Sequence, residues 1–184
     1  MSLPGLHKPL LGALVGVLLM PMAALAESAK EIEANVTSAL TLLYSKNPAA
    51  AALGKDAKGI LVFPHVVKGG LIIGASHGTG ALRISNTTEG YYQTTSGSLG
   101  LQAGIESRKE VIMFMTTEAL DKFRASKNWQ AGIDGSIAVI QTGTGGSANT
   151  KNQQAPIVGY IFGNEGLYGG LNFEGAKISG YTPE

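Results

Sequence analysis

The sequence predicts an α+β fold in a single domain. We expect a strongly curved antiparallel sheet or partly closed β-barrel, with an N-terminal amphipathic helix and a few short helices. Apolar residues recur with a helical period after residue 26 and with a period of two after Lys58, and glycines interrupt the later apolar runs. Short strands joined by short turns are typical of antiparallel sheets, and glycines inside strands mark bulges or bends. A curved sheet accommodates both features.

Residues 1–26 have the organisation of a secretory signal peptide. Lys8 supplies positive charge, Leu10–Met20 is an apolar run, and Ala24–Ala26 is a small-residue cleavage site. The apolar run is shorter than the ~20 residues that a membrane-spanning helix needs. We therefore expect cleavage, a mature domain over residues 27–184, and export to the periplasm or extracellular space of a bacterial cell envelope, with the protein peripheral on a membrane.

Two helices are expected before the first strand. Glu27–Tyr44 carries apolar residues three and four positions apart, so they share one helix face. That face needs to be buried, either against the sheet or in a membrane surface. Asn47 is a suitable N-cap for a short helix over Ala49–Leu53, which Gly54 would close. The residues of the shared face are Ile32, Val36, Ala39, Leu40 and Leu43.

The rest of the chain is mainly strands. Tight turns are expected at Asn86–Gly90 and Glu106–Lys109, and a glycine-rich bend at Gly74–Gly78. One helix is expected to begin near Thr117 and to bury Leu120 and Phe123. Gly143–Gln154 is predicted to be a polar loop. The predicted strands are Gly59–Phe63, Gly70–Ala75, Ala81–Ser85, Tyr91–Thr95, Ser98–Ile105, Val111–Met115, Ser136–Thr142, Ile157–Phe162, Gly166–Phe173 and Ala176–Ser179.

Composition narrows the classes of function. The chain has no cysteine, which excludes disulfides and thiol chemistry. After residue 26 it has as many acidic as basic residues, so it lacks the positive field of a nucleic-acid-binding protein. We therefore expect no nucleic acid among its partners.

Catalytic, cofactor and metal patterns are weak. Ser76 lies in a G-x-S-x-G match, but a nucleophile elbow needs a helix next and a histidine farther along the chain, and the sequence after Gly78 offers neither. A G-x-G-x-x-A match at Gly143–Ala148 has no predicted helix after it to hold a pyrophosphate. His65 and His77 could meet across a hairpin, yet zinc sites usually have three or four ligands. We expect a non-catalytic protein without metal or cofactor, and keep a Ser76 hydrolase only as a remote alternative.

Several sequence blocks follow one another in a fixed order: Ala57–Pro64, Gly74–Leu82, Tyr92–Gly104, Phe114–Phe123, Trp129, Gly132–Ser136 and Pro156–Gly166. Together they resemble the SYLF domain, a lipid-binding module. The resemblance extends from about Lys58 to Tyr181. It implies a domain that binds lipid; eukaryotic members bind phosphoinositides and can engage actin through a lysine-rich N-terminal segment. The predicted N-terminal helix of this chain has Lys30 as its one basic residue beside three glutamates.

Two functions follow as hypotheses. The first is recognition of anionic phospholipid at a membrane of the cell envelope. The second is a structural or interaction module that docks another envelope protein. For the first, four lysines cluster in sequence around the predicted short helix and first strand, and each could add ~1 kcal/mol at an anionic surface. The predicted lipid-binding residues are Lys46, Lys55, Lys58 and Lys68, with the apolar face formed by Ile32, Val36, Leu40 and Leu43.

Overall fold

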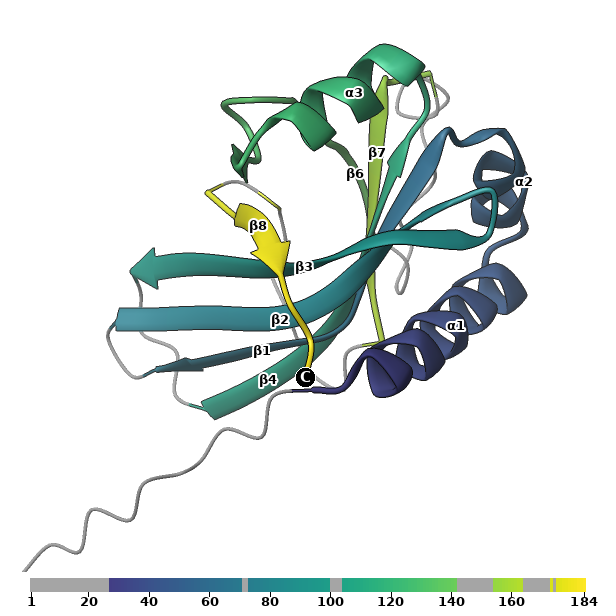
Figure 1. The fold of residues 1–184 in the computed structure, drawn as a ribbon. Coiled ribbons are helices and arrows are strands. Elements are labelled where there is room, and N and C mark those ends of the chain that lie inside the picture. Colours follow the sequence, from purple (N-terminus) through teal and green to yellow (C-terminus); the bar gives the residue numbers. More distant parts are fainter. Residues whose placement is uncertain (1–26, 71–72, 100–103, 142–153, 164–172, 174) are drawn as a thin grey trace, which may run out of the picture.

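A computed structural model of the chain describes residues 27–70, 73–99, 104–141, 154–163, 173 and 175–184. The predicted signal peptide, the polar loop at Gly143–Gln154 and the predicted strand at Gly166–Phe173 lie outside these residues, apart from Gln154 and Phe173. The described part forms three helices and eight strands (Figure 1). The helices are α1 (Ala29–Lys46), α2 (Pro48–Asp56) and α3 (Thr117–Ala125). The strands are β1 (Gly59–Gly70), β2 (Ile73–Ile84), β3 (Thr87–Leu99), β4 (Gly104–Phe114), β5 (Asn128–Gln130), β6 (Ala138–Gln141), β7 (Ile157–Phe162) and β8 (Lys177–Tyr181).

All eight strands belong to one sheet, in the order β5-β8-β3-β2-β1-β4-β7-β6. Neighbours pair antiparallel except β6 and β7, which are parallel. The sheet curls into a half-barrel (Figure 1), so the predicted α+β class with a strongly curved sheet is confirmed. The parallel pair at one edge makes the sheet mixed rather than purely antiparallel. Sequence periodicity does not distinguish the two pairings in a strand of four residues.

Both faces of the sheet are buried over its central part. Side chains alternate along each strand, so Leu61 and Phe63 point into the curve while Val62 points out of it. α3 lies across the inside of the curve and α1 against the outside (Figure 1). We call these two sides the inner and outer faces. Strands buried on both faces read as continuous apolar runs, which explains the Ile60–Phe63 and Val111–Phe114 segments.

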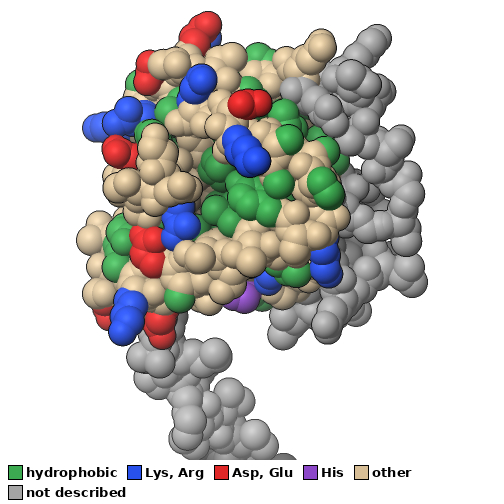
Figure 2. Space-filling view, turned by 90° about the vertical axis from the view of Figure 1, so that its right-hand side faces the viewer, with side chains coloured by type: hydrophobic (Ala, Val, Ile, Leu, Met, Phe, Trp, Pro, Cys, Tyr) green, Lys and Arg blue, Asp and Glu red, His purple; other side chains and the backbone are tan. Residues whose placement is uncertain are grey.

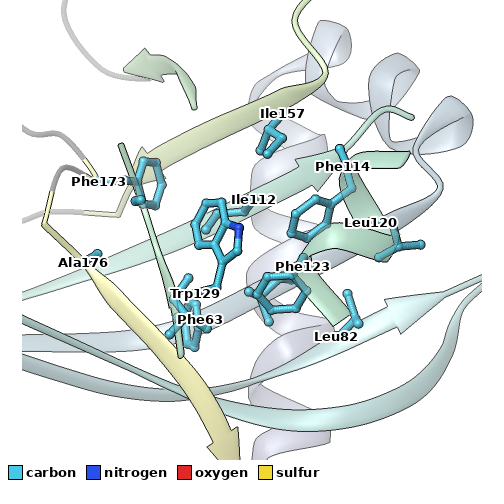
Figure 3. Close-up of a cluster of buried hydrophobic side chains, with 14 of the residues drawn as sticks. Phe63, Leu82, Ile112, Phe114, Leu120, Phe123, Trp129, Ile157, Phe173 and Ala176 are labelled. Atoms are coloured by element: carbon cyan, nitrogen blue, oxygen red, sulfur yellow. The ribbon is translucent and has the colours of Figure 1, made fainter. Parts of the chain in front are cut away.

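The inner core is aromatic. Phe123 of α3 is the centre of three ring contacts, with centroids 5.1 Å from Tyr92, 4.9 Å from Phe114 and 5.8 Å from Trp129. Figure 3 shows Trp129 and Phe123 facing Phe63 and Leu82 from the sheet. The helix prediction for this segment is confirmed, with Leu120 and Phe123 buried. Its N-cap is Thr116, one residue before the predicted start, and the Thr116 side chain accepts a hydrogen bond from the Ala119 N–H.

The first four strands are longer than predicted. β1 continues past Pro64 through a bulge between Val62 and His65, β2 runs through the predicted bend at Gly74–Gly78, and β4 runs through the predicted turn at Glu106–Lys109. Those bend and turn predictions were wrong. Glycine and polar residues are tolerated inside these strands because pairing keeps the backbone extended: β2 is paired with both β1 and β3 through the first segment, and β4 with β1 through the second. The tight β2–β3 turn comes earlier than predicted, at Ser85 and Asn86, whose φ angles are +49° and +66°.

The short helix also differs from the prediction at its end. Asn47 is its N-cap, with the side chain accepting from the Ala50 N–H at 2.9 Å, as predicted. Gly54, however, lies within α2, which continues to Asp56. A Cβ at Gly54 would collide with the Tyr44 hydroxyl of α1. This glycine therefore allows two helices to approach closely instead of ending one of them.

Candidate functional site

The structure separates the four predicted lipid-binding lysines. Lys46 ends α1, Lys55 lies in the last turn of α2, and Lys58 immediately precedes β1. All three are exposed, and we call them the hairpin lysines. α2 has nine residues and so spans only ~13 Å, which keeps the three lysines near the two ends of one short helix. Lys68 lies ten residues farther along β1, up to ~33 Å away for an extended strand, and is not part of this group.

The surface around the hairpin lysines is mixed. Figure 2 looks at the right-hand side of Figure 1, where α2 and the end of α1 lie. Basic and acidic side chains alternate there around an apolar area, and they do not form one continuous basic patch. The two helices contribute partly buried apolar side chains such as Leu42 and Leu53. A charged surface that met this side would therefore encounter separate lysines beside apolar groups.

The apolar face of α1 is in the protein core. Ile32, Val36 and Leu43 are at most 1% exposed, and Leu40 is 8% exposed. They pack on the outer face of the sheet with Val62, Ala81 and Val111 among others. Of the two ways to bury this face, packing on the sheet is the one the structure adopts. A direct role for these four side chains in lipid contact would require α1 to leave the sheet.

Polar contacts also hold α1 in place. Arg83 of β2 forms an ion pair with Glu33 at 2.9 Å and donates to the Thr37 hydroxyl at 2.8 Å. Burial raises the pKa of Glu33, but hydrogen bonds from Arg83 and Tyr91 and the Arg83 charge outweigh that effect, so the net change in its pKa is downward. A capping box at Ser28 and Glu31 fixes the first turn of the helix. These contacts oppose detachment of the helix.

A second group of polar side chains lies on the inner face, beyond the aromatic core. Directly paired residues of antiparallel strands share a face, so Lys68, Ser76 and Ser96 form one row, and the register continues on the other side of Lys68 to Glu106 of β4. The next row contains Arg108, Val66, Gly78 and Thr94, and Val66 belongs to the inner core. We call this group the inner polar cluster. It consists of Lys68, Ser76, Thr94, Ser96, Arg108 and Glu110.

The inner polar cluster contains a buried ion pair. The Arg108 guanidinium donates to one Glu110 carboxylate oxygen through Nη2 at 2.6 Å and Nε at 2.7 Å. The side chains are 14% and 2% exposed, respectively. Burial raises the pKa of Glu110, and the Arg108 charge and hydrogen bond only partly oppose that change. Nearby, the Ser76 and Ser96 hydroxyl oxygens are 2.6 Å apart and hydrogen-bonded.

Glu110 should make protein stability depend on pH in a recognisable direction. Its pKa is higher in the folded state than the ordinary value of 4.5, so the folded protein binds this proton more tightly. Its contribution to stability is therefore greatest below pH 4.5 and declines as the pH rises through the raised pKa. We expect the unfolding free energy of the wild type, measured against Glu110→Gln, to fall with rising pH over this range. Urea titrations from pH 4 to pH 8 measure it.

Glu118 provides the control for that experiment. It is exposed and its pKa is lowered by a hydrogen bond from Lys122 and by the Lys122 charge. The wild type measured against Glu118→Gln should show a flat or oppositely directed dependence on pH. A Glu110 difference that rises with pH would contradict the assignment of a buried carboxyl group that favours its neutral form.

The alternatives of a hydrolase and a metal site receive no support from the geometry. Ser76 lies inside β2, which continues to Ile84, whereas a nucleophile elbow requires a helix after the serine. His77 follows Ser76 directly and so points to the opposite face, and His65 shares the outer face with Thr79, its register partner. The described residues contain no group of three potential metal ligands. Within the same part of the chain, no helix is long and apolar enough to cross a membrane.

Sequence reasoning missed most of the inner polar cluster. Only Lys68 was predicted as a binding residue, and it was assigned to a different group. Glu106, Arg108 and Glu110 recur at a spacing of two, which is the signal that could have identified a strand with one polar face. The prediction of a turn at Glu106–Lys109 concealed that alternation.

Comparison with known proteins gives a family match over the C-terminal part of the chain. Residues 95–183 match the family model described as Ysc84, Las17-binding protein actin regulator. The matched segment begins in β3 and includes α3 and every later strand. It covers the Phe114–Phe123 block, Trp129 and Pro156–Gly166, which carried the resemblance noted in the sequence. A search of curated proteins found none that matches the chain. The family match over residues 95–183, and the blocks that it covers, support the resemblance of this chain to the SYLF domain family.

Proposed function

We propose that this protein is a non-catalytic binding module of the cell envelope and that it recognises anionic phospholipid through the hairpin lysines. The family is one of lipid- and actin-related binding modules, which makes binding the expected class of function. Protein partners of the kind that the family description prints are the alternative. The observation that carries the lipid proposal is the exposure of Lys46, Lys55 and Lys58 around the short helix α2.

The charge environment of these lysines supports the proposal. The ion pairs among the described residues involve Arg83, Arg108, Lys122 and Arg124, and none of the hairpin lysines. A lysine without an ion-pair partner is available to an anionic surface, where each contributes ~1 kcal/mol. Partly buried Leu42 and Leu53 lie on the same two helices and could add apolar contact with the membrane interface. The interaction is thus expected to combine charge with a small apolar contribution.

Reversing two of the three charges tests this proposal. The Lys55→Glu/Lys58→Glu variant should lose roughly thirtyfold or more in affinity for anionic vesicles, since at least ~2 kcal/mol of attraction is removed. Co-sedimentation with phosphatidylglycerol-containing vesicles measures it, with phosphatidylcholine vesicles as the neutral comparison. Wild-type binding should weaken as salt rises, because the screening length falls from ~10 Å at 0.1 M to ~3 Å at 1 M.

Lys127 and Lys177 supply a matched control. Both are exposed and lie near or in the β5–β8 edge of the sheet, away from α2. Lys127→Glu/Lys177→Glu changes the net charge by the same amount and should retain most of the binding. Equal loss in both variants would indicate a response to overall charge and no site at the hairpin lysines. If the wild-type protein does not bind anionic vesicles at low salt, the proposal is excluded.

Docking of another envelope protein is the second candidate, and one observation favours it. Ile133 is 74% exposed at a turn whose backbone is tightly hydrogen-bonded, with Asp134 accepting from the Gln130 N–H at 2.6 Å and Gly132 donating to the Gly135 carbonyl. A well-ordered turn that presents a large apolar side chain suits protein contact better than solvent. If vesicle binding fails, this turn is the first surface to test for protein partners.

A further inference from the structure

The C-terminal end of β3 has a backbone edge without a partner strand in the described part of the chain. β2 pairs with β3 on one side as far as Leu99. On the other side β8 pairs only with Tyr91–Thr95, so the described strands leave that side of the last four residues, Ser96–Leu99, unpaired. Figure 1 shows the end of β3 extending past β8, at the left of the view. We call these four residues the open edge of β3.

The path of the chain into β8 keeps this edge open. If β8 extended backwards from Lys177, the preceding residues would lie beside the open edge. Instead they form a turn, in which the Ala176 N–H donates to the Phe173 carbonyl at 2.9 Å and Gly175 has a φ angle of +76°. Phe173 and Ala176 are buried in the inner core. Core packing therefore directs this part of the chain away from β3.

The open edge lacks the features that protect strand edges from pairing. Its sequence, Ser-Gly-Ser-Leu, contains no charged residue and no proline. Gly97 is exposed, and a Cβ there would have no described atom within 4 Å. Pairing with β2 already holds the backbone extended. An incoming strand could therefore form hydrogen bonds without first ordering this segment, which lowers the entropic cost of association.

The other edges of the described sheet are better protected. The part of β4 that extends beyond β7 carries Glu106 and Arg108, and charged residues oppose pairing at an edge. β5 and β6, at the two ends of the sheet, are separate short strands of three and four residues. Within the same protein, the best match for the open edge of β3 is thus the same edge of a second copy. Contact between identical surfaces is the arrangement of a two-fold dimer.

We propose that two copies of this chain associate through their open β3 edges, which pair antiparallel about a two-fold axis and join two curved sheets into one. Strand addition of this kind is held by backbone hydrogen bonds. Because the four residues are uncharged, no like charges meet across the axis. The contact is short, and interfaces below ~1,000 Å² are weak or transient. We therefore expect a dimer that forms at high protein concentration.

Sedimentation equilibrium of the purified protein measures this association. We expect monomer at about 10 μM and an increasing share of dimer toward about 1 mM. Gly97→Lys brings two like charges together in the dimer and should raise its Kd by at least about tenfold. Gly97→Ala is the matched uncharged variant and should associate like the wild type. Both variants should fold, because Gly97 is exposed and has space for a side chain.

Cysteine cross-linking locates the contact, because the chain has no cysteine of its own. Gly97→Cys should form a cross-linked dimer with a short bismaleimide at high protein concentration. Gly180→Cys in β8 is the control, since Gly180 is also exposed and also has space for a Cβ. Gly180 pairs with Tyr92, which lies five residues and so ~17 Å from Gly97 along β3. The control should therefore give little or no cross-linked dimer.

The outcomes are independent of the lipid proposal. The hairpin lysines lie around α2, at the right of Figure 1 and far from the end of β3, so Lys55→Glu/Lys58→Glu should associate like the wild type. Protein that remains monomeric up to about 1 mM would overturn the inference. A dimer that Gly97→Lys does not weaken, or equal cross-linking of Gly97→Cys and Gly180→Cys, would overturn it as well, because the contact would then lie elsewhere.

Discussion

Replacement of Leu43 by aspartate should destabilise the protein by about 4 kcal/mol or more. Leu43 is 1% exposed where α1 packs on the outer face of the sheet. Truncating a buried leucine alone costs ~2–5 kcal/mol, and a carboxylate adds the cost of burying a charged group without a partner. Small domains are stable by only ~5–15 kcal/mol, so the variant should be at or near the unfolding threshold.

The matched control is Thr41→Asp. Thr41 is exposed on the same helix, so an aspartate there remains in water and should change stability by less than about 1 kcal/mol. Urea unfolding followed by the fluorescence of Trp129 is a suitable measurement. Trp129 is the only tryptophan of the chain and lies in the inner core, on the other side of the sheet. A loss reported there shows that the two cores unfold together.

The same pair of variants distinguishes packing of α1 on the sheet from its location on a membrane. If the helix lay on a membrane and left the sheet, Leu43→Asp would reduce vesicle binding and leave stability in the absence of lipid unchanged. With α1 on the sheet, stability falls without any lipid present. Equal stability of Leu43→Asp and Thr41→Asp would contradict the packing of α1 described here.

The sequence predicted the class of fold and the helices because their signals are local. The period of apolar residues in α1, the cap at Asn47 and the buried pair in α3 each depend on residues within a few positions of one another. The length of a strand depends on its pairing partners, which lie far along the chain. Local composition therefore predicted turns where the strands continue. Gly74–Gly78 and Glu106–Lys109 have the composition of turns, yet pairing with neighbouring strands keeps them extended.

The two candidate sites also differ in how far the sequence could predict them. The hairpin lysines could be grouped from sequence because one short helix connects them. Lys68 could not be separated from them, since its position depends on the full length of β1. The inner polar cluster draws on β1, β2, β3 and β4, and only the register of those strands brings Ser96 and Arg108 to the same face. Spacing along the chain can show that one strand has a polar face, but it does not show which strands present such faces side by side.

Gly80→Ala is expected to cost about 3 kcal/mol, an unusually large effect for the addition of one methyl group. The bulge between Val62 and His65 brings the β1 backbone against β2 at this position. A Cβ at Gly80 would collide with the Val62 carbonyl oxygen and lie 2.8 Å from the Phe63 ring. The carbonyl belongs to a strand paired on both sides, so it cannot move aside without breaking sheet hydrogen bonds.

Gly97→Ala in β3 is the control for backbone effects. A Cβ at Gly97 would have no atom within 4 Å, and the residue is exposed. Alanine there should be neutral or stabilising by up to ~1 kcal/mol, because it restricts the unfolded chain. Thermal unfolding of the two variants compares them directly. If Gly80→Ala were as stable as Gly97→Ala, β1 and β2 could not approach as closely as the bulge requires. The register of β1 beyond Pro64, which places Lys68 beside Ser76, would then be wrong, and the inner polar cluster would lose its geometric basis.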